Sequence, residues 1–90
     1  MGSLKFVFTE RFQEYFTKLD EQSQNAIQKA IRLMSHDIKH PSLRAKKMEG
    51  TDYIFEASAN MDIRITFHYE KPDHLILRNC GHHDRTLHNP

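Results

Sequence analysis

The sequence predicts one α+β domain, in which a helical hairpin packs on a small, mainly antiparallel sheet. Apolar residues recur every three or four positions between residues 12 and 34, which is typical of amphipathic helices. From residue 53 onward they alternate with polar residues, which is typical of strands with one buried face. Because 90 residues suffice for one domain, residues 1–90 are predicted to form a single unit in the order β-α-α-β-β-β.

The first half of the chain is predicted to contain one strand and two helices. Residues 4–8 are apolar and aromatic, which favours a strand. Thr9 and Asp20 are residue types that cap helix N-termini, so a helix is expected to begin after each of them. Pro41 marks the end of the helical region. The apolar stripes are Phe12, Tyr15, Phe16 and Leu19 in the first helix, and Ala26, Ile27, Ala30, Ile31 and Met34 in the second.

Three strands are predicted in the second half. They begin at Tyr53, near residue 62 and at Leu75, and the last one is reached through a turn at residues 71–73 and ends at Gly81. Alternation in the middle strand divides its side chains between two faces. The core face is predicted to hold Ile63, Ile65 and Phe67, and the solvent-exposed face Asp62, Arg64, Thr66 and His68.

The composition excludes several classes of protein. The chain has 13 Lys and Arg residues against 12 Asp and Glu residues, so bulk positive charge is not its means of binding nucleic acid. Its single cysteine, Cys80, allows no internal disulfide and fits a reducing cytoplasm. No apolar run approaches the roughly 20 residues that span a bilayer, and residues 1–5 lack the apolar stretch of a signal peptide. We therefore expect a cytoplasmic protein without a membrane partner.

Four segments resemble motifs of the RelE/ParE family of toxins from toxin–antitoxin systems. Residues 43–50 (LRAKKMEG) resemble the segment that leads into the family's second strand, and Tyr53 resembles the start of that strand. Residues 62–67 (DIRITF) resemble the strand with a central arginine, and residues 76–84 (ILRNCGHHD) resemble the last strand and its exit. The resemblance covers nearly the whole chain. It implies a RelE-like fold, a cognate antitoxin as partner and a toxin–antitoxin hetero-oligomer.

The resemblance also implies an activity. Family members of the ribonuclease branch cut messenger RNA, usually on the ribosome, whereas ParE-type members inhibit DNA gyrase. Ile54 and Glu56 stand where RelE has lysines, and Leu87 stands where it has a C-terminal tyrosine. The site therefore resembles that of the histidine-using YoeB- and YafQ-like branch. This implies a translation-inhibiting mRNA endoribonuclease with mRNA and the ribosome as partners.

Metal-free RNA cleavage needs a proton acceptor for the ribose 2′-hydroxyl, a cation at the phosphate and an acid for the leaving 5′-oxygen. His83 is the predicted acid, because relatives of this branch keep a catalytic histidine there, and His82 could replace it. Arg64 stands at the family's arginine position and is the predicted phosphate ligand. Asp62 and His68 are candidates for accepting the proton or for orienting the group that does. We expect no metal and no cofactor.

Four basic residues are predicted to hold the RNA backbone. Arg44, Lys46 and Lys47 belong to residues 39–47, a segment that contains no carboxylate. Arg78 lies on the last predicted strand. For the two lysines, a solvated basic loop is an equally simple explanation.

Three other interpretations stay open. A ParE-like inhibitor of DNA gyrase would need no catalytic residues. A degenerate toxin homologue would retain only the ability to bind its antitoxin. A metal-binding module is the third interpretation, although the spacing of its ligands matches no standard zinc motif. Its ligands would be His74, Cys80, His82 and His83.

Overall fold

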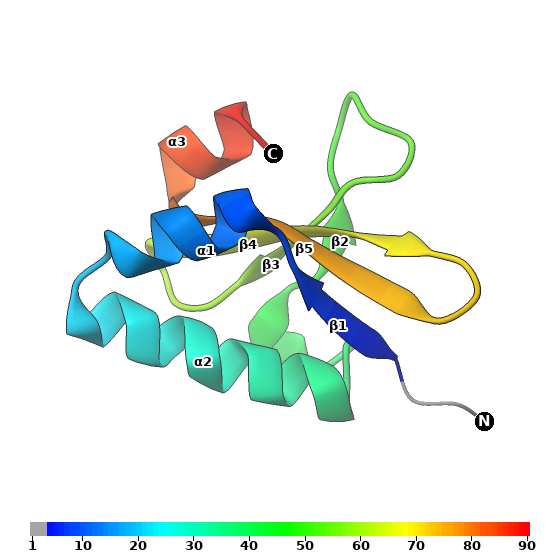
Figure 1. The fold of residues 1–90 in the computed structure, drawn as a ribbon, viewed down its shortest axis with the longest axis horizontal. Helices are drawn as coiled ribbons and strands as arrows, with labels where there is room; N and C mark the ends of the chain where they lie inside the picture. Colours follow the sequence, from blue (N-terminus) through cyan, green and yellow to red (C-terminus); the bar gives the residue numbers. More distant parts are fainter. Residues whose placement is uncertain (1–3) are drawn as a thin grey trace.

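The computed structural model describes residues 4–90, which form a five-stranded sheet with helices on both of its faces (Figure 1). The elements in chain order are β1 (Lys5–Phe8), α1 (Glu10–Thr17), α2 (Glu21–His36), the 3-10 helix η1 (Pro41–Leu43), β2 (Lys46–Lys47), β3 (Phe55–Ser58), β4 (Ile63–Glu70), β5 (His74–His82) and α3 (His83–His88). The strand order is β1-β5-β4-β3-β2, in which β1 and β5 are parallel and the other pairs antiparallel. The predicted α+β class and mainly antiparallel sheet are confirmed.

Three elements were absent from the prediction: the 3-10 helix η1, the strand β2 and the helix α3. The two-residue strand β2 pairs Lys46 with Glu56 and Lys47 with Phe55, and it is too short to show an alternating pattern. The six-residue helix α3 has no apolar stripe, so the spacing of apolar residues in the sequence did not predict it. Residues 1–3, which belong to the predicted domain and to the segment considered for a signal peptide, lie outside the described residues.

The helical hairpin is capped as predicted. The Thr9 hydroxyl accepts a hydrogen bond from the Phe12 amide at 3.1 Å, and the Asp20 carboxylate accepts one from the Ser23 amide at 3.0 Å. The Thr9 hydroxyl also lies 2.8 Å from the Leu77 carbonyl, to which it can donate, so the start of α1 is tied to β5. None of the helices within residues 4–90 combines the length and apolarity needed to cross a bilayer.

The core lies between α2 and the sheet. The predicted core face of β4 is confirmed, because Ile63, Ile65 and Phe67 are buried. They pack in one cluster with Phe12 of α1, with three side chains of α2 and with apolar residues of β5. The α2 side chains in this cluster are Ile27, Ala30 and Met34.

The opposite face of the sheet was predicted to be open to solvent. In the structure, part of this face is covered. Thr66 is completely buried, because α3 contacts β4 and β5 on this face. Arg85 of α3 donates to the Cys80 carbonyl at 2.8 Å. Gly81 has a φ of +145°, which side chains rarely adopt, and an added Cβ would lie 3.0 Å from the Thr86 hydroxyl of α3. The glycine therefore lets α3 lie closely over the end of β5.

The cap of α1 is testable. Thr9→Ala removes the cap and the hydroxyl contact with the Leu77 carbonyl, so we expect it to lower the free energy of unfolding by about 1–2 kcal/mol. Thr9→Ser retains the hydroxyl and should lose less. Thr17→Ala, at the exposed end of the same helix, serves as control and should change the value by less than about 0.5 kcal/mol. Urea denaturation measures all three, and equal effects of Thr9→Ala and Thr17→Ala would contradict the assignment.

Candidate functional site

A β-bulge in β5 shapes the middle of the sheet face on which α3 lies, which we call the α3-side face. Thr66 pairs with Asn79, but the next residue, Phe67, pairs with Leu77, so Arg78 is an extra residue in β5. Bulges re-aim side chains and are frequent beside functional sites. Because of this one, the consecutive residues Arg78 and Asn79 both lie on the α3-side face, where each makes side-chain contacts.

Arg78, His68 and Tyr53 form a cluster on this face. Arg78 Nη1 lies 2.9 Å from His68 Nδ1, and the guanidinium carbon lies 5.6 Å from the centre of the Tyr53 ring. The Tyr53 and His68 rings meet edge to face, with 5.8 Å between their centres. Tyr53 is 56% exposed, so part of its ring is available to a ligand. Tyr53 was predicted only as a strand residue, with no role in the site.

The contact with Arg78 fixes the hydrogen-bonding role of His68. A guanidinium has only donors, so Nδ1 of His68 must be the acceptor and the neutral ring carries its proton on Nε2. Burial lowers the pKa of His68 from the usual 6.5, and the positive charge of Arg78 lowers it further. His68 is therefore a neutral hydrogen-bond donor at Nε2. This arrangement does not suit the role of proton acceptor for which His68 was a candidate.

A second group lies where β5 passes into α3. His82 Nδ1 is 2.6 Å from the Asp62 carboxylate, although the two residues are 20 positions apart. The His83 amide donates to the Asp62 carbonyl at 2.8 Å. His83 Nδ1 lies 3.0 Å from the carboxylate of Asp84. The structure thus brings together Asp62, His82 and His83, three of the predicted catalytic residues.

In this second group each histidine is held by a carboxylate. A carboxylate only accepts, so Nδ1 of His82 and of His83 carries the proton. In the neutral ring this leaves the Nε2 lone pair free to take up a proton. The hydrogen bond from His83 lowers the pKa of Asp84 below its ordinary value of 3.8, so Asp84 stays charged opposite His83. Both histidine side chains are exposed to solvent.

Arg64 lies on the α3-side face, as predicted, opposite Gly81 of β5. Its Nη1 atom donates to the carbonyls of Asn60, Met61 and Ile63 at 2.8, 3.2 and 3.2 Å. Among residues 4–90 it forms no ion pair with a carboxylate. Arg64 and Arg44 line one hollow of about 470 Å³ between the 3-10 helix and the turn before β4.

The predicted RNA-binding residues do not form one patch. Arg44 shares its hollow with Arg64, whereas Lys46 and Lys47 lie on the short edge strand β2. Lys46 faces Glu56 across the strand pair, which offsets part of its charge. Arg78 lies in the bulge of β5. His68 and Arg64 are four residues apart on β4, a separation of about 13 Å.

The residues considered as ligands of a metal-binding module do not lie close together in the structure. His74 pairs with Asp73 at the start of β5, far along the strand from His82. Cys80 is buried in the core, and burial raises the pKa of its thiol to about 12. Within residues 4–90 no three His, Cys, Asp or Glu side chains form a possible metal site.

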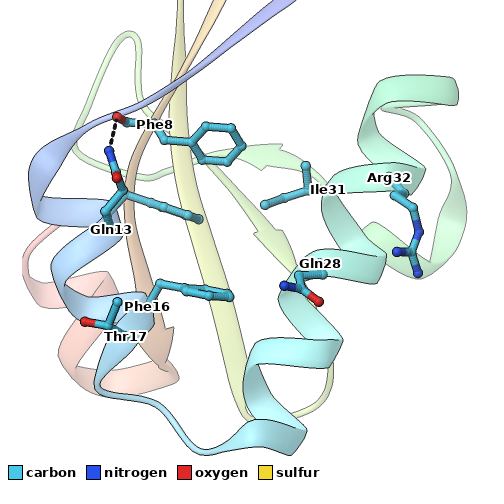
Figure 2. Close-up of a pocket in the computed structure, with 8 residues that line it drawn as sticks. Phe8, Gln13, Phe16, Thr17, Gln28, Ile31 and Arg32 are labelled. Carbon is cyan, nitrogen blue, oxygen red and sulfur yellow. Dashed lines mark hydrogen bonds between the residues drawn. The ribbon is translucent and has the colours of Figure 1, made fainter.

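An apolar groove of about 460 Å³ lies between α1 and α2 (Figure 2). Its floor is formed by the aromatic rings of Phe8, Phe12 and Phe16 with Ile31 of α2, and Phe8 is 42% exposed. Gln13 borders the groove, where its side-chain amide donates to the Phe8 carbonyl at 2.9 Å. The remaining polar border consists of Thr17, Gln28 and Arg32.

The protonation of His68 gives a test of this geometry. We expect NMR titration to yield a His68 pKa below 6.5 in the wild type and a higher value in Arg78→Met, with only partial recovery because burial is the larger cause. Arg32→Met should leave this pKa unchanged. Since the folded-state pKa is lowered, the associated stability is present above pH 6.5 and is lost as the pH falls through the folded-state value. A wild-type pKa at or above 6.5 would contradict the assigned contact.

No family model and no curated protein matches the sequence. Among solved structures, a chain of the Escherichia coli DinJ–YafQ toxin–antitoxin complex superposes with a TM-score of 0.76 at 9% identity, covering 92% of this chain and 96% of that one. A chain of the archaeal RelE–RelB complex from Pyrococcus horikoshii gives 0.73 at 11% identity, covering 94% and 100%.

The YoeB dimer from Staphylococcus aureus gives a TM-score of 0.70 at 15% identity, covering 91% of this chain and 99% of that one. Identities this low reveal a shared backbone and leave the activity to be argued from the side chains. The motifs in the sequence implied the same fold. The chain therefore shares the fold of the solved YoeB, YafQ and RelE chains.

Proposed function

We propose that this protein is the toxin of a type II toxin–antitoxin system and an endoribonuclease that cleaves messenger RNA on the ribosome, in the cytoplasm. The observation that carries the proposal is the pair of adjacent, exposed histidines at the end of β5. His82 and His83 each present Nδ1 to a carboxylate, at 2.6 and 3.0 Å. Two such histidines can supply the acid and the base that RNA cleavage requires.

The proposed reaction is an internal transfer of the phosphoryl group. Neutral His82, oriented by Asp62, takes the proton of the ribose 2′-hydroxyl, whose oxygen forms a bond to phosphorus. The bond from phosphorus to the 5′-oxygen breaks as protonated His83, stabilised by Asp84, gives that oxygen its proton. The products are a 2′,3′-cyclic phosphate and a 5′-hydroxyl, and the two histidines end in exchanged protonation states.

Arg64 is the proposed ligand of the scissile phosphate. It pairs with Gly81, the residue before His82 in β5, and only its Nη1 atom is engaged by carbonyls. Its Nη2 and Nε donors are thus left for a phosphate oxygen. Arg44, in the same hollow, together with Lys46 and Lys47 on β2, can contact neighbouring phosphates.

Single-turnover cleavage of a ribosome-bound message tests the mechanism. We expect His82→Gln and His83→Gln each to lower the rate about 10²-fold or more, because glutamine cannot exchange a proton near neutral pH. Arg64→Ala should lower it by a similar factor, since a charge-assisted contact is lost. The control His36→Gln, at the exposed end of α2, should cleave at the wild-type rate.

Two results would overturn the mechanism. One is near-normal cleavage by both histidine variants. The other is a product that carries a 5′-phosphate. If the wild type blocks growth, cuts no RNA and inhibits purified gyrase, the protein is instead a ParE-like inhibitor.

A cognate antitoxin is the proposed protein partner. Two structural neighbours were solved as the toxin–antitoxin complexes DinJ–YafQ and RelE–RelB. In this chain the groove between α1 and α2 offers an apolar floor of three phenylalanines and Ile31, which fits the apolar face of an amphipathic helix. Beside it, β1 pairs only with β5 within residues 4–90, so its other edge can accept a strand.

We expect Ile31→Glu to weaken antitoxin binding by tenfold or more, because it places a charge in the apolar groove. Lys29→Glu, a charge change on the exposed side of the same helix, should have little effect. Calorimetry with the purified antitoxin measures the affinities, and thermal melting checks that Ile31→Glu is folded. Equal affinities of the two variants would rule out the groove as the docking site.

A further inference from the structure

Three aromatic side chains of β3 and β4 pack together on the core side of the sheet. Phe55 and Phe67 pair across the two strands, and their rings stack with 5.6 Å between the centres. The Tyr69 ring meets both of them edge to face, at 5.4 and 5.8 Å. Phe67 is completely buried, whereas Tyr69 is 44% exposed. Part of this aromatic surface is therefore accessible to a ligand.

A hollow of about 280 Å³ opens beside these rings. The three rings form part of its lining, and members of the segment 38–45, which follows α2, form the rest. Its polar side chains are Lys39, His40 and Arg44 together with the Tyr69 hydroxyl, and none of the described lining residues is Asp or Glu. Mostly apolar walls with a few polar groups are typical of small-molecule sites. The polar groups here favour an anion, because lysine and arginine carry a positive charge.

Hydrogen bonds hold the segment that carries these cations. The Lys39 amide donates to the Asp37 carboxylate at 3.1 Å, and the His40 amide donates to the Asp37 carbonyl at 3.0 Å. The Arg44 amide donates to the Pro41 carbonyl at 3.2 Å, and the Arg44 backbone is left-handed, with a φ of 48°. The turn is therefore formed before a ligand binds, which lowers the entropic cost of binding.

The charged side chains of the hollow can bind a carboxylate. Neither Lys39 nor Arg44 forms an ion pair with an Asp or Glu side chain within residues 4–90. The planar guanidinium of Arg44 can donate two parallel hydrogen bonds to one carboxylate, and Lys39 adds a second positive charge. Burial raises the pKa of Tyr69, so its hydroxyl stays protonated at neutral pH and can donate as well.

We propose that this hollow binds a small aromatic carboxylate, whose ring packs against Phe55 and Tyr69 while its carboxylate is bound by Arg44 and Lys39. Aromatic rings attract one another in edge-to-face and offset arrangements, and the charged end adds hydrogen bonds that orient the ligand. The hollow is slightly smaller than the roughly 300–1,000 Å³ of typical ligand pockets, so a molecule with one ring fits best.

Arg44 connects this site with the proposed function. It also lines the hollow that contains Arg64, where we assign it to an RNA phosphate. A guanidinium that binds the carboxylate of the ligand is not available to that phosphate, so the ligand and the RNA should weaken each other's binding. This consequence rests on the proposed function, whereas binding of the carboxylate does not.

NMR titration of the full chain with 3-phenylpropionate, a carboxylate with one ring, tests the site. We expect the amide signals of Ile38, Phe55 and Tyr69 to shift, whereas that of Phe16, in the groove between α1 and α2, stays in place. The neutral 3-phenylpropionamide should bind about tenfold more weakly, because it lacks the charge that Arg44 binds. Propionate, which has no ring, should not bind measurably at the same concentration.

Matched variants separate the charge from the shape of the hollow. Arg44→Asn removes the guanidinium, and asparagine tolerates the left-handed backbone. It should weaken binding of 3-phenylpropionate about tenfold and leave binding of the amide unchanged. Lys39→Gln should weaken binding of the carboxylate about threefold, as expected for an exposed charge. Lys29→Gln, on the exposed side of α2, is the control and should bind both ligands as the wild type does.

Three results would overturn the site. They are equal affinities for 3-phenylpropionate and its amide, equal effects of Arg44→Asn on both ligands, and signal shifts confined to the groove between α1 and α2. A blocked acidic tripeptide with a central phenylalanine tests the other source of this chemistry. If it binds more than about tenfold more tightly than 3-phenylpropionate, the hollow is instead a docking site for a protein.

A 2′-O-methyl pentanucleotide, which cannot be cleaved, measures the competition for Arg44. Saturating 3-phenylpropionate should lower its affinity about fivefold in the wild type and leave it unchanged in Arg44→Asn. An unchanged affinity in the wild type would overturn the competition. If 3-phenylpropionate binds as expected but the wild type cleaves no message on ribosomes, the ligand site stands and the proposed ribonuclease function fails. Normal cleavage without binding of 3-phenylpropionate would leave the ribonuclease and remove the site.

Discussion

The antiparallel pairing of β4 with β5, with one extra residue in β5, is the constraint on which the rest of the structure depends. Leu77 and Cys80 both face the core although they are three residues apart, because the bulge at Arg78 reverses the alternation of side chains. Without the bulge, Cys80 would point away from the core. The same irregularity places Arg78 and Asn79 together on the opposite face, so core packing and the chemistry of that face are linked.

This pairing also separates two groups of polar residues. At the end of β5 the register brings His82 beside Asp62, where two carboxylate-bound histidines lie next to each other in sequence. In the middle of the strands, the bulge brings Arg78 to His68, whose ring becomes a donor. The first group suits proton transfer, because its Nε2 atoms are free. The second suits binding, because the exposed Tyr53 ring lies beside the Arg78 guanidinium.

The backbone resembles toxins with which it shares 8 to 23% of its residues. A fold can persist at such identities, since the buried positions need only apolar side chains of fitting volume. The core here follows that rule, with Ile, Leu, Phe and Met side chains between α2 and the sheet. Catalytic activity in an enzyme depends instead on a few polar side chains. This chain lacks the lysines of a RelE-like site, because Ile54 and Glu56 stand at their positions.

The sequence by itself determined the class of fold, both helix caps and the core face of β4, because hydrophobic period and capping are local properties of the chain. It also marked His82, His83 and Arg64 as chemically suitable residues. Only the tertiary structure decided which of them meet, since the bulge in β5 and the helix α3 leave no periodic signal. The pairing of His82 with Asp62 and the contact of Thr9 with Leu77 join residues 20 and 68 positions apart, a separation at which local sequence pattern carries no information.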